Sequence, residues 1–388
     1  MQTVERMAPF LDEMVALRRH LHAHPELGLE EYNTSKLVAS LLEGWGYAVT
    51  TGLGQTGVVG TLSNGTGRKS VGLRADFDAL PIFEETGLPY TSKTPGLMHA
   101  CGHDGHTAML LAAARYMAET RDFDGTLHLI FQPAEENFGG AKLMIDDGLF
   151  DRFPCDAIFG MHNMPDMEAG VFGFKEGTLF ANAEGFDVTL TGVGGHASTP
   201  EVTHDPIVAG ASIIMALQTL VSRNLDPMEA GVVTVGLFQA GRASNAIPQT
   251  ATMTVDARAF TTEVAELLNR RIPEVIRLQA ESFGVKATIT PMTGYPVLVN
   301  ESAMTQFARK VAVDTVGDAR VIDLKRPYTG AEDFSYMLQK TPGSYLVLGS
   351  KSDTAKPLHH PGYDFNDHVL LTGAAYWADL ARHFLAGA

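Results

Sequence analysis

The chain has 388 residues, of which 45% are hydrophobic and 19% charged, and 39 are glycines. Because single hydrophobic cores stop growing beyond about 250–300 residues, this length predicts two domains. The net charge of -16 argues against binding to nucleic acids and anionic membranes, since like charges repel, and favours small or neutral ligands.

The cysteine count and the apolar runs predict where the protein resides. Two cysteines, Cys101 and Cys155, are too few for a disulfide framework and are typical of a reducing compartment. The N-terminal stretch lacks a basic segment followed by an apolar one. The most apolar run, "PIVAGASIIMALQTLV", is too short and too polar to span a bilayer. We therefore expect a soluble, cytoplasmic protein without a membrane partner.

The first part of the chain alternates between helix and strand signals. An opening amphipathic helix is predicted by apolar residues at helical spacing, namely Phe10, Met14, Leu17 and Leu21. A second helix is predicted with Thr34 or Ser35 as N-cap and Gly46 as C-cap. Further on, a helix is expected from Thr107 to about Ala118, among the strands "YAVT", "GVVGTL", "SVGLRAD", "TLHLIF" and "AIFGMH" and the helix "GGAKLMIDDG". This alternation predicts an α/β fold with a mostly parallel, helix-covered sheet.

After Ala183 the pattern changes to that of a separate module. Strand "GFDVTLTGV" is followed by a helix that Asp205 caps and Pro206 starts, and then by the strands "GVVTVGLFQ" and "QTATMTVDARAF". A long helix, in which Pro273 is expected to cause a kink, and the strand "VKATIT" complete the module. The order β-α-β-β-α-β is that of the split βαβ, or ferredoxin-like, fold.

From about Pro296 the α/β alternation returns, with two helices, the strand "SYLVLGS", the loop "LHHPGYDFND" and a closing helix. We therefore expect a catalytic domain made of residues 1–183 and 296–388. The ferredoxin-like module, residues 184–295, is expected as an insert.

Side chains that can bind metal lie at the ends of several predicted strands. In open α/β sheets, ligands bind beyond the carboxyl ends of the strands. The candidates there are Asp76, Asp78, Glu135, Glu136, His162, His359 and His360, with the stretch "HACGHDGHT" ahead of a helix start. Each group alone also fits a polar loop or a structural histidine. Together, thiol, imidazole and carboxylate form the ligand set of zinc, manganese and cobalt sites.

Several competing motifs are absent from the sequence: H-E-x-x-H, P-C-x-x-C, G-x-S-x-G and the phosphate-binding P-loop. The adjacent Glu135 and Glu136 are informative because neighbouring side chains point apart. One can bind a metal while the other faces the substrate as general base, which is the division that metal-assisted amide hydrolysis needs.

The sequence closely resembles the dinuclear-metal amidohydrolases, a subfamily of the M20 metallopeptidases that includes hippurate hydrolase, bacterial aminoacylases and carboxypeptidases, and the plant auxin-conjugate hydrolases. The resemblance rests on segments that run in family order across nearly the whole chain: "RADFDALP", "HACGHDGHTAMLLAAA", "FQPAEENFGGAKLMIDDGL", "FGMHN", "GGHASTP", "SNAIPQTATMTVDARAF", "GAEDFSYM" and "LHHPGYDFND". It implies a catalytic domain with two divalent metal ions, for which manganese or zinc is expected and cobalt or nickel is the alternative. It also implies a lid domain used for dimerisation and closure over the substrate.

The resemblance also implies roles for individual residues. The implied metal ligands are Cys101, His103, Glu136, His162 and His359. Glu135 resembles the general base and Asp78 the aspartate that orients a ligand, whereas His99 and His106 are expected to be structural. From the lid, His196 would stabilise the oxyanion, and Asn245 and Arg258 would contact the substrate. The family tail has two consecutive acids where this chain reads "YDFNDH", which leaves the role of Asp367 open.

The expected activity is hydrolysis of N-acyl amino acids to a carboxylate and a free amino acid. A metallo-carboxypeptidase or dipeptidase is the alternative, because its substrates present the same amide and carboxylate. A nonenzymatic, metal-binding dimeric scaffold is the alternative of another class, but a scaffold has no need of Glu135 beside the ligands. The expected partners are the small substrate and a second copy of the chain, not nucleic acid or membrane.

Overall fold

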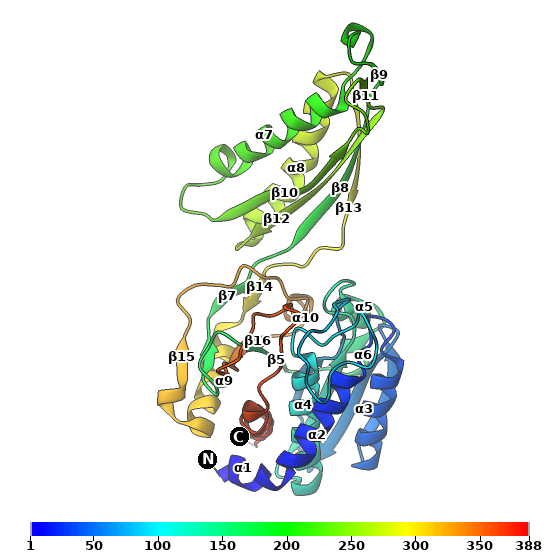
Figure 1. Cartoon of the computed structure of the whole chain (residues 1–388). Helices are drawn as coiled ribbons and strands as arrows, with labels where there is room; N and C mark the ends of the chain where they lie inside the picture. Colours follow the sequence, from blue (N-terminus) through cyan, green and yellow to red (C-terminus); the bar gives the residue numbers. More distant parts are fainter. Residues whose placement is uncertain (1, 387–388) are drawn as a thin grey trace. The chain divides into compact units, whose positions relative to one another are not determined.

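A computed structural model describes residues 2–386, which form two compact units (Figure 1). The first unit contains Met1–Leu179, Val299–Arg326 and Asp333–Ala388, and the second contains Phe180–Leu298 and Pro327–Glu332. The unit boundaries lie within a few residues of the expected domain boundaries at 183/184 and 295/296. The short segment Pro327–Glu332, which we expected in the catalytic domain, groups with the second unit.

Three helices open the first unit: α1 (Gln2–Met7), α2 (Leu11–Ala23) and α3 (Tyr32–Gly44), with the 3-10 turn η1 (Ala8–Phe10) between the first two. The prediction that Thr34 or Ser35 caps α3 was wrong. The Glu26 carboxylate accepts hydrogen bonds from the backbone N–H groups of Asn33 and Thr34, at 3.1 and 2.8 Å, so the helix begins earlier. Such a cap comes from outside the helix and leaves no local signal.

The sheet of the first unit has eight strands in the order β1-β2-β4-β3-β5-β16-β6-β15. Their bounds are β1 (Ala48–Leu53), β2 (Gly57–Asn64), β3 (Ser70–Asp76), β4 (Gly125–Gln132), β5 (Ala157–Met164), β6 (Phe172–Phe174), β15 (Val321–Asp323) and β16 (Gly343–Gly349). The central strands β4, β3, β5 and β16 are parallel, so their carboxyl ends meet at one edge. The pairs β1–β2, β2–β4 and β16–β6 are antiparallel, so the expected α/β architecture with a mostly parallel, helix-covered sheet is confirmed.

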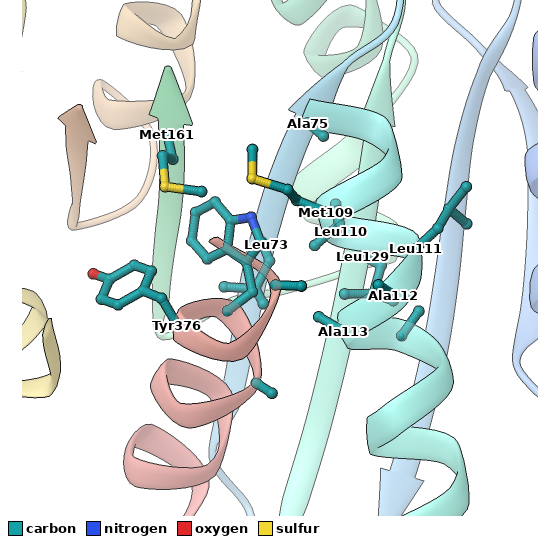
Figure 2. Packing of buried hydrophobic residues seen from close by; sticks show 14 of the residues in the cluster. Leu73, Ala75, Met109, Leu110, Leu111, Ala112, Ala113, Leu129, Met161 and Tyr376 are labelled. Atoms are coloured by element: carbon teal, nitrogen blue, oxygen red, sulfur yellow. The ribbon is translucent and has the colours of Figure 1, made fainter. Parts of the chain in front are cut away.

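The core of the first unit lies between this sheet and its long helices, chiefly α4 (His103–Thr120), α9 (Ser302–Val316) and α11 (Leu370–Leu385). Figure 2 shows Met109–Ala113 of α4 packed beside Leu73 of β3 and Leu129 of β4. Shorter elements complete the unit: α5 (Gly140–Asp146), α6 (Leu149–Arg152), α10 (Phe334–Leu338), η3 (Asp318–Arg320) and η4 (Asp367–Val369), with β7 (Gly177–Phe180) and β14 (Leu298–Asn300) pairing at the unit boundary.

Helix α4 begins at His103 and not at Thr107 as we expected. Gly102 occupies the N-cap position with φ of +96°, which turns the chain directly from the cysteine into the helix. His103 and His106 therefore belong to the first turn of α4. Two of the three histidines of the stretch "HACGHDGHT" are thus part of the helix, and only His99 precedes it.

The second unit has the order β8 (Glu184–Thr191), α7 (Pro206–Asn224), β10 (Gly231–Ala240), β12 (Thr250–Ala259), α8 (Thr262–Ser282) and β13 (Lys286–Pro291). Its four strands lie in the order β10-β12-β8-β13 and all pair antiparallel. This is the strand order of a split βαβ fold. The short strands β9 (Gly195–His196) and β11 (Ala246–Ile247) pair beside it, near η2 (Pro200–Val202). Helix α8 continues through Pro273 from Thr262 to Ser282.

The run "PIVAGASIIMALQTLV", which we expected to be too short and too polar to span a bilayer, is part of the 19-residue helix α7. Over its 19 residues it is apolar enough to cross a membrane by length and composition alone, with a mean hydropathy of 1.4. One face of the helix, including Ala209, Ile213 and Leu217, is buried in the core of the second unit with the sheet and α8. That burial is the behaviour of a packed helix of a globular domain.

Candidate metal centre

The five predicted metal ligands come from four neighbouring places at the carboxyl edge of the first unit's sheet. Cys101 and His103 stand at the start of α4, Glu136 follows β4, His162 lies near the end of β5, and His359 follows β16. The structure brings all five together, because β4, β5 and β16 are parallel and only β3 lies between β4 and β5. The distance from Cys101 Sγ to His162 Nε2 is 3.4 Å, and that from His359 Nε2 to Glu136 Oε1 is 3.2 Å.

The donors form two groups that share the cysteine. Donor atoms within 4.8 Å of one another belong to Cys101, His103 and His162 in one group, and to Cys101, Glu136 and His359 in the other. A third overlapping group contains His103, Glu136 and the buried Glu135. The geometry thus offers two adjacent cation positions joined by one thiol, with an additional carboxylate beside them.

Each ligand histidine from the buried side of the site has one ring nitrogen fixed by an oxygen acceptor. His103 Nδ1 donates to the carbonyl and to Oδ1 of Asp78, at 3.0 and 3.1 Å. His162 Nδ1 donates to the carbonyl of Asn163 at 2.7 Å. When the ring is neutral, as a metal ligand must be, Nε2 is the unprotonated nitrogen in both residues, and it points towards the other donors.

Asp78 orients a second ligand as well. Its Oδ2 accepts a hydrogen bond of 3.0 Å from the backbone N–H of Glu136, so one buried carboxylate holds both His103 and the loop after β4. This is the orienting position that the sequence analysis expected for Asp78. Removing it would free two ligands at once.

The residues fit a cation. His103 Nε2 is buried and has no hydrogen-bond partner among residues 2–386. Burial acts to lower the pKa of His103, but the carboxylates of Asp76 and Asp78 and, further, of Glu136 raise it to about 10. Burial raises the pKa of the Cys101 thiol well above its usual range, and the neighbouring Glu136 and Glu135 raise it further. A buried negative cluster around an unpartnered imidazole is the environment that a divalent cation compensates.

His359 shows backbone strain at the site. Its φ of +66° lies in the left-handed region, which a non-glycine residue adopts at a cost. Its backbone N–H donates to the carbonyl of Ala100 at 2.8 Å, which ties the loop to the residue before Cys101. The adjacent His360 is exposed and uses Nδ1 to accept from the Gly362 N–H at 2.9 Å. Of the two histidines, His359 is the one placed beside Glu136.

The other two histidines of the stretch "HACGHDGHT", His99 and His106, are buried. His106 Nδ1 is 2.6 Å from Asp76 Oδ1, and its Nε2 is 2.7 Å from Asn163 Oδ1, so both nitrogens have protein partners. His99 is buried, and burial lowers its pKa to about 4, which keeps the ring neutral. Neither residue belongs to the two groups that share Cys101.

Sequence reasoning missed a buried polar network beneath the site. Arg74 of β3 donates to Asp76, Gln132 and Asp333, at 2.7, 2.8 and 3.0 Å. Asn163 donates to the Tyr363 hydroxyl at 2.7 Å and so joins β5 to the loop after β16. The one available signal was a charged residue within the apolar strand "SVGLRAD", because a buried arginine must be paired.

A second missed network supports the loop that follows His359. Arg18 of α2 is buried and forms ion pairs with Asp364 at 2.9 Å, Asp367 at 2.7 Å and Asp104 at 3.6 Å. The acids of "YDFNDH" are thus held from the N-terminal helix, although they are not consecutive. Asp104 in turn is 2.9 Å from His22, whose pKa is lowered by burial but raised overall to about 9 by Asp104 and Glu84.

The predicted lid residues all lie in the second unit. Pairing of β9 with β11 places His196 opposite Ala246, and the carbonyl of Asn245 accepts from the Ala197 N–H at 3.0 Å, so these two loops lie side by side. His196 is exposed, and its Nδ1 accepts from the Ser198 backbone N–H at 3.1 Å. Arg258 on β12 forms two hydrogen bonds with Asp256, at 2.9 and 3.0 Å. Its guanidinium is therefore already engaged by a carboxylate.

A parallel α/β sheet that gathers thiol, imidazole and carboxylate donors at its carboxyl edge, with a further buried carboxylate beside them, defines a metal-dependent enzyme. The chain belongs to Peptidase family M20/M25/M40, whose sequence model matches residues 72–383. It is 42% identical over 385 residues to the hippurate hydrolase of Campylobacter jejuni, covering 99% of this chain and 100% of that protein. It is 40% identical over 392 residues to IAA-amino acid hydrolase ILR1-like 4 of Arabidopsis thaliana, covering 99% of this chain and 88% of that protein.

The fold agrees with a solved structure of the same family. The crystal structure of the YxeP protein of Bacillus subtilis, described as a dinuclear metal binding peptidase from the M20 family, matches with a TM-score of 0.82 and 32% identity. The match covers 97% of this chain and 99% of that one. The chain is therefore an amidohydrolase that uses divalent metal ions, and the nonenzymatic scaffold is excluded.

Proposed function

We propose that this enzyme hydrolyses the amide bond of N-acyl amino acids, releasing a carboxylate and a free amino acid. The observation that carries the proposal is the buried Glu135 in one group with His103 and Glu136. The relatives named above support the substrate class, because hippurate and indoleacetyl-amino acids are both N-acyl amino acids.

The residues that would hold two cations are Cys101, His103, Glu136, His162 and His359, with Cys101 common to both positions. Manganese or zinc suits this mixed set of thiol, imidazole and carboxylate donors. When bound, a divalent cation lowers the pKa of a water molecule and polarises the scissile carbonyl.

Glu135 is the general base in this proposal. It accepts the proton of the attacking water and then donates it to the nitrogen of the leaving amino acid. The backbone N–H of its neighbour Glu136 donates to Asp78, which holds the loop that carries both glutamates.

His196 is proposed as the donor that stabilises the oxyanion. A backbone N–H can only donate, so the bond from Ser198 makes Nδ1 of the neutral ring an acceptor and places the proton on Nε2. His196 thus presents an N–H donor from an exposed loop, and removing one such donor typically costs about 3–4 kcal/mol of transition-state stabilisation. Asn245, on the paired loop, is proposed to contact the substrate. Arg258 is proposed as a second substrate contact, through the part of its guanidinium that Asp256 does not bind.

We further propose that the enzyme is a cytoplasmic homodimer joined through the second unit. Strand β10 is ten residues long and lies at the edge of its sheet, where unpaired backbone groups invite a partner. Helix α7 exposes Ile207, Val208 and Met215, the last to 71%. An exposed apolar surface of this kind is typical of a protein interface.

Light scattering tests the dimer. Met215→Glu should shift the measured mass from that of a dimer to that of a monomer. Met292→Glu, just after β13 at the other edge of the sheet, is the control and should leave the mass unchanged.

The experiment that tests the activity compares wild type with Glu135→Gln. We expect metal content near that of wild type and a loss of turnover of about 10²-fold or more, because a proton acceptor is removed and no ligand is. Glu43→Gln, an exposed change on α3, is the matched control and should keep full activity.

The substrates in that comparison are hippurate, N-acetyl amino acids, indoleacetyl-aspartate and dipeptides. Wild-type turnover of dipeptides alone would make the enzyme a dipeptidase or carboxypeptidase. Unchanged turnover of Glu135→Gln at full metal content would remove Glu135 from the mechanism.

A further inference from the structure

Glu31 is a fully buried carboxylate that stands far from the metal ligands in sequence and next to their loop in space. Its side chain is 0% exposed. Oε1 accepts a hydrogen bond of 2.9 Å from the backbone N–H of Ala134, and Oε2 accepts one of 2.6 Å from the Thr56 hydroxyl. Glu31 thus joins the turn between β1 and β2 to the loop that carries Glu135 and Glu136.

The side chain of Glu31 is directed away from the helix that it precedes. Glu31 occupies the N-cap position of α3 but makes no side-chain cap hydrogen bond. Glu26 supplies that cap from outside, as described above. A glutamate buried for helix capping would be redundant here, so its two hydrogen bonds to other segments need a different explanation.

Backbone strain gathers around Glu31. Five non-glycine residues of the described chain have positive φ, namely Leu29, Gln55, Arg121, Ala134 and His359. Three of them adjoin this carboxylate: Leu29 lies two residues before it, Gln55 precedes its partner Thr56, and Ala134 is its other partner. Strained backbone of this kind is unfavourable and persists where surrounding contacts impose it, often at functional sites.

The segment before Glu31 also presses directly against the loop. A Cβ atom on Gly28 would lie only 3.0 Å from Cα and Cβ of Ala134, so this glycine allows a close approach of the two backbones. Gln55 Nε2 donates to the carbonyl of Leu29 at 2.6 Å and closes the other side of the segment.

We propose that Glu31 is a positioning residue for the catalytic loop: with Asp78, it clamps the backbone N–H groups on either side of Glu135. Glu31 holds the N–H of Ala134, and Asp78 holds that of Glu136. The direction of the Glu135 side chain is set between these two fixed points. This inference rests on the proposed roles of Glu135 as base and Glu136 as ligand.

The test compares Glu31→Met with Glu31→Gln. Methionine fills a similar volume without an acceptor, whereas glutamine keeps an oxygen for the Ala134 N–H and can donate to the Thr56 hydroxyl. We expect kcat on an N-acyl amino acid to fall about 10²-fold in Glu31→Met with little change in KM, since a displaced catalytic group costs about this much. Glu31→Gln should recover activity to within a few-fold of wild type.

Two readouts do not depend on turnover. Hydrogen exchange of the peptide spanning 133–139 should be faster in Glu31→Met than in wild type, and restored in Glu31→Gln. Cobalt affinity, followed by the thiolate absorption band of Cys101, should weaken in Glu31→Met because Glu136 is less well placed. Glu30→Met, an exposed change one residue earlier, is the matched control and should leave all measurements unchanged.

The proposal is overturned if Glu31→Met keeps wild-type kcat and exchange, or if Glu31→Gln loses as much as Glu31→Met. If Glu31→Met does not fold, Thr56→Val, which removes one of the two bonds, must accelerate exchange of 133–139 and lower kcat. A failed base assignment is recognised separately, because Glu135→Gln would then keep turnover while the exchange effect of Glu31→Met remained.

Discussion

Replacing Arg18 by methionine should strongly destabilise the first unit. The Arg18 side chain is 0% exposed and forms ion pairs with Asp104, Asp364 and Asp367, whose side chains are 0%, 31% and 16% exposed. Methionine fills much of the volume but removes the cation that the three carboxylates share, leaving Asp104 with His22 and Asp367 with Arg19. Breaking a buried ion pair from one side costs about 3–5 kcal/mol, because the remaining charge stays buried without compensation. We expect a loss in this range at pH 7.

The chain offers a matched control one residue further along. Arg19 also pairs with Asp367, at 2.8 Å, but its side chain is 45% exposed. Solvent screens this pair, so Arg19→Met should cost less than about 1 kcal/mol. Urea unfolding followed by tryptophan fluorescence is the assay, because both tryptophans, Trp45 and Trp377, lie in the first unit. All proteins are compared at the same metal loading.

The pH dependence gives an independent check. Burial acts to raise the pKa of Asp104, but His22, His99 and Arg18 lower it overall. A carboxylate whose pKa is lowered by folding contributes stability that is present above the pKa of the unfolded state, near 4. This stability is lost as the pH falls towards the pKa of the folded state. Without Arg18 this contribution is smaller, so the deficit of Arg18→Met should shrink as the pH falls below the unfolded value of about 4 towards the folded value. A deficit below about 1 kcal/mol at pH 7, or one that stays unchanged as the pH falls well below about 4, refutes the reasoning.

Four further predictions concern the site and the assembly. The Cys101 thiol should react readily with thiol reagents in the metal-free enzyme and resist them when metal is bound; equal labelling of both forms would show that Cys101 is not a ligand. Gly102→Ala should weaken metal binding, because the φ of Gly102 is +96° and the new Cβ would lie 2.3 Å from Asn163 Oδ1. Metal titration measures this, and an affinity equal to that of wild type would contradict the prediction. The pKa of His22 is raised to about 9, so this residue contributes stability that is fully present below pH 6.5 and is lost as the pH rises to 9. In His22→Gln the free energy of unfolding should therefore change less over that pH range. If His196 acts across a dimer interface, mixing the His196→Ala protein with the Glu135→Gln protein should restore about a quarter of wild-type activity. Half of the randomly formed dimers are then heterodimers, and each heterodimer carries one intact site. Inactive heterodimers would mean that His196 acts within its own chain or not at all.

The sequence alone determined the parts of this protein that depend on local pattern. Apolar periodicity and turn residues predicted the strands β3, β4, β5 and β16, and with them the parallel sheet. Because parallel strands end at one edge, the positions of Glu136, His162 and His359 at strand ends predicted that they would meet. The adjacent Glu135 and Glu136 suggested separate tasks because neighbouring side chains point apart.

Only the tertiary structure decided what holds these groups in place. Arg18, Glu26 and Glu31 act on residues that lie elsewhere in the chain, and nothing in their local sequence distinguishes them from surface charges. The cap of α3 was mispredicted because its acceptor lies outside the helix, and α4 starts early because Gly102 adopts a left-handed conformation between two ligands. Burial and long-range pairing determine the role of a charged side chain, and both exist only once the sheet and its helices have packed.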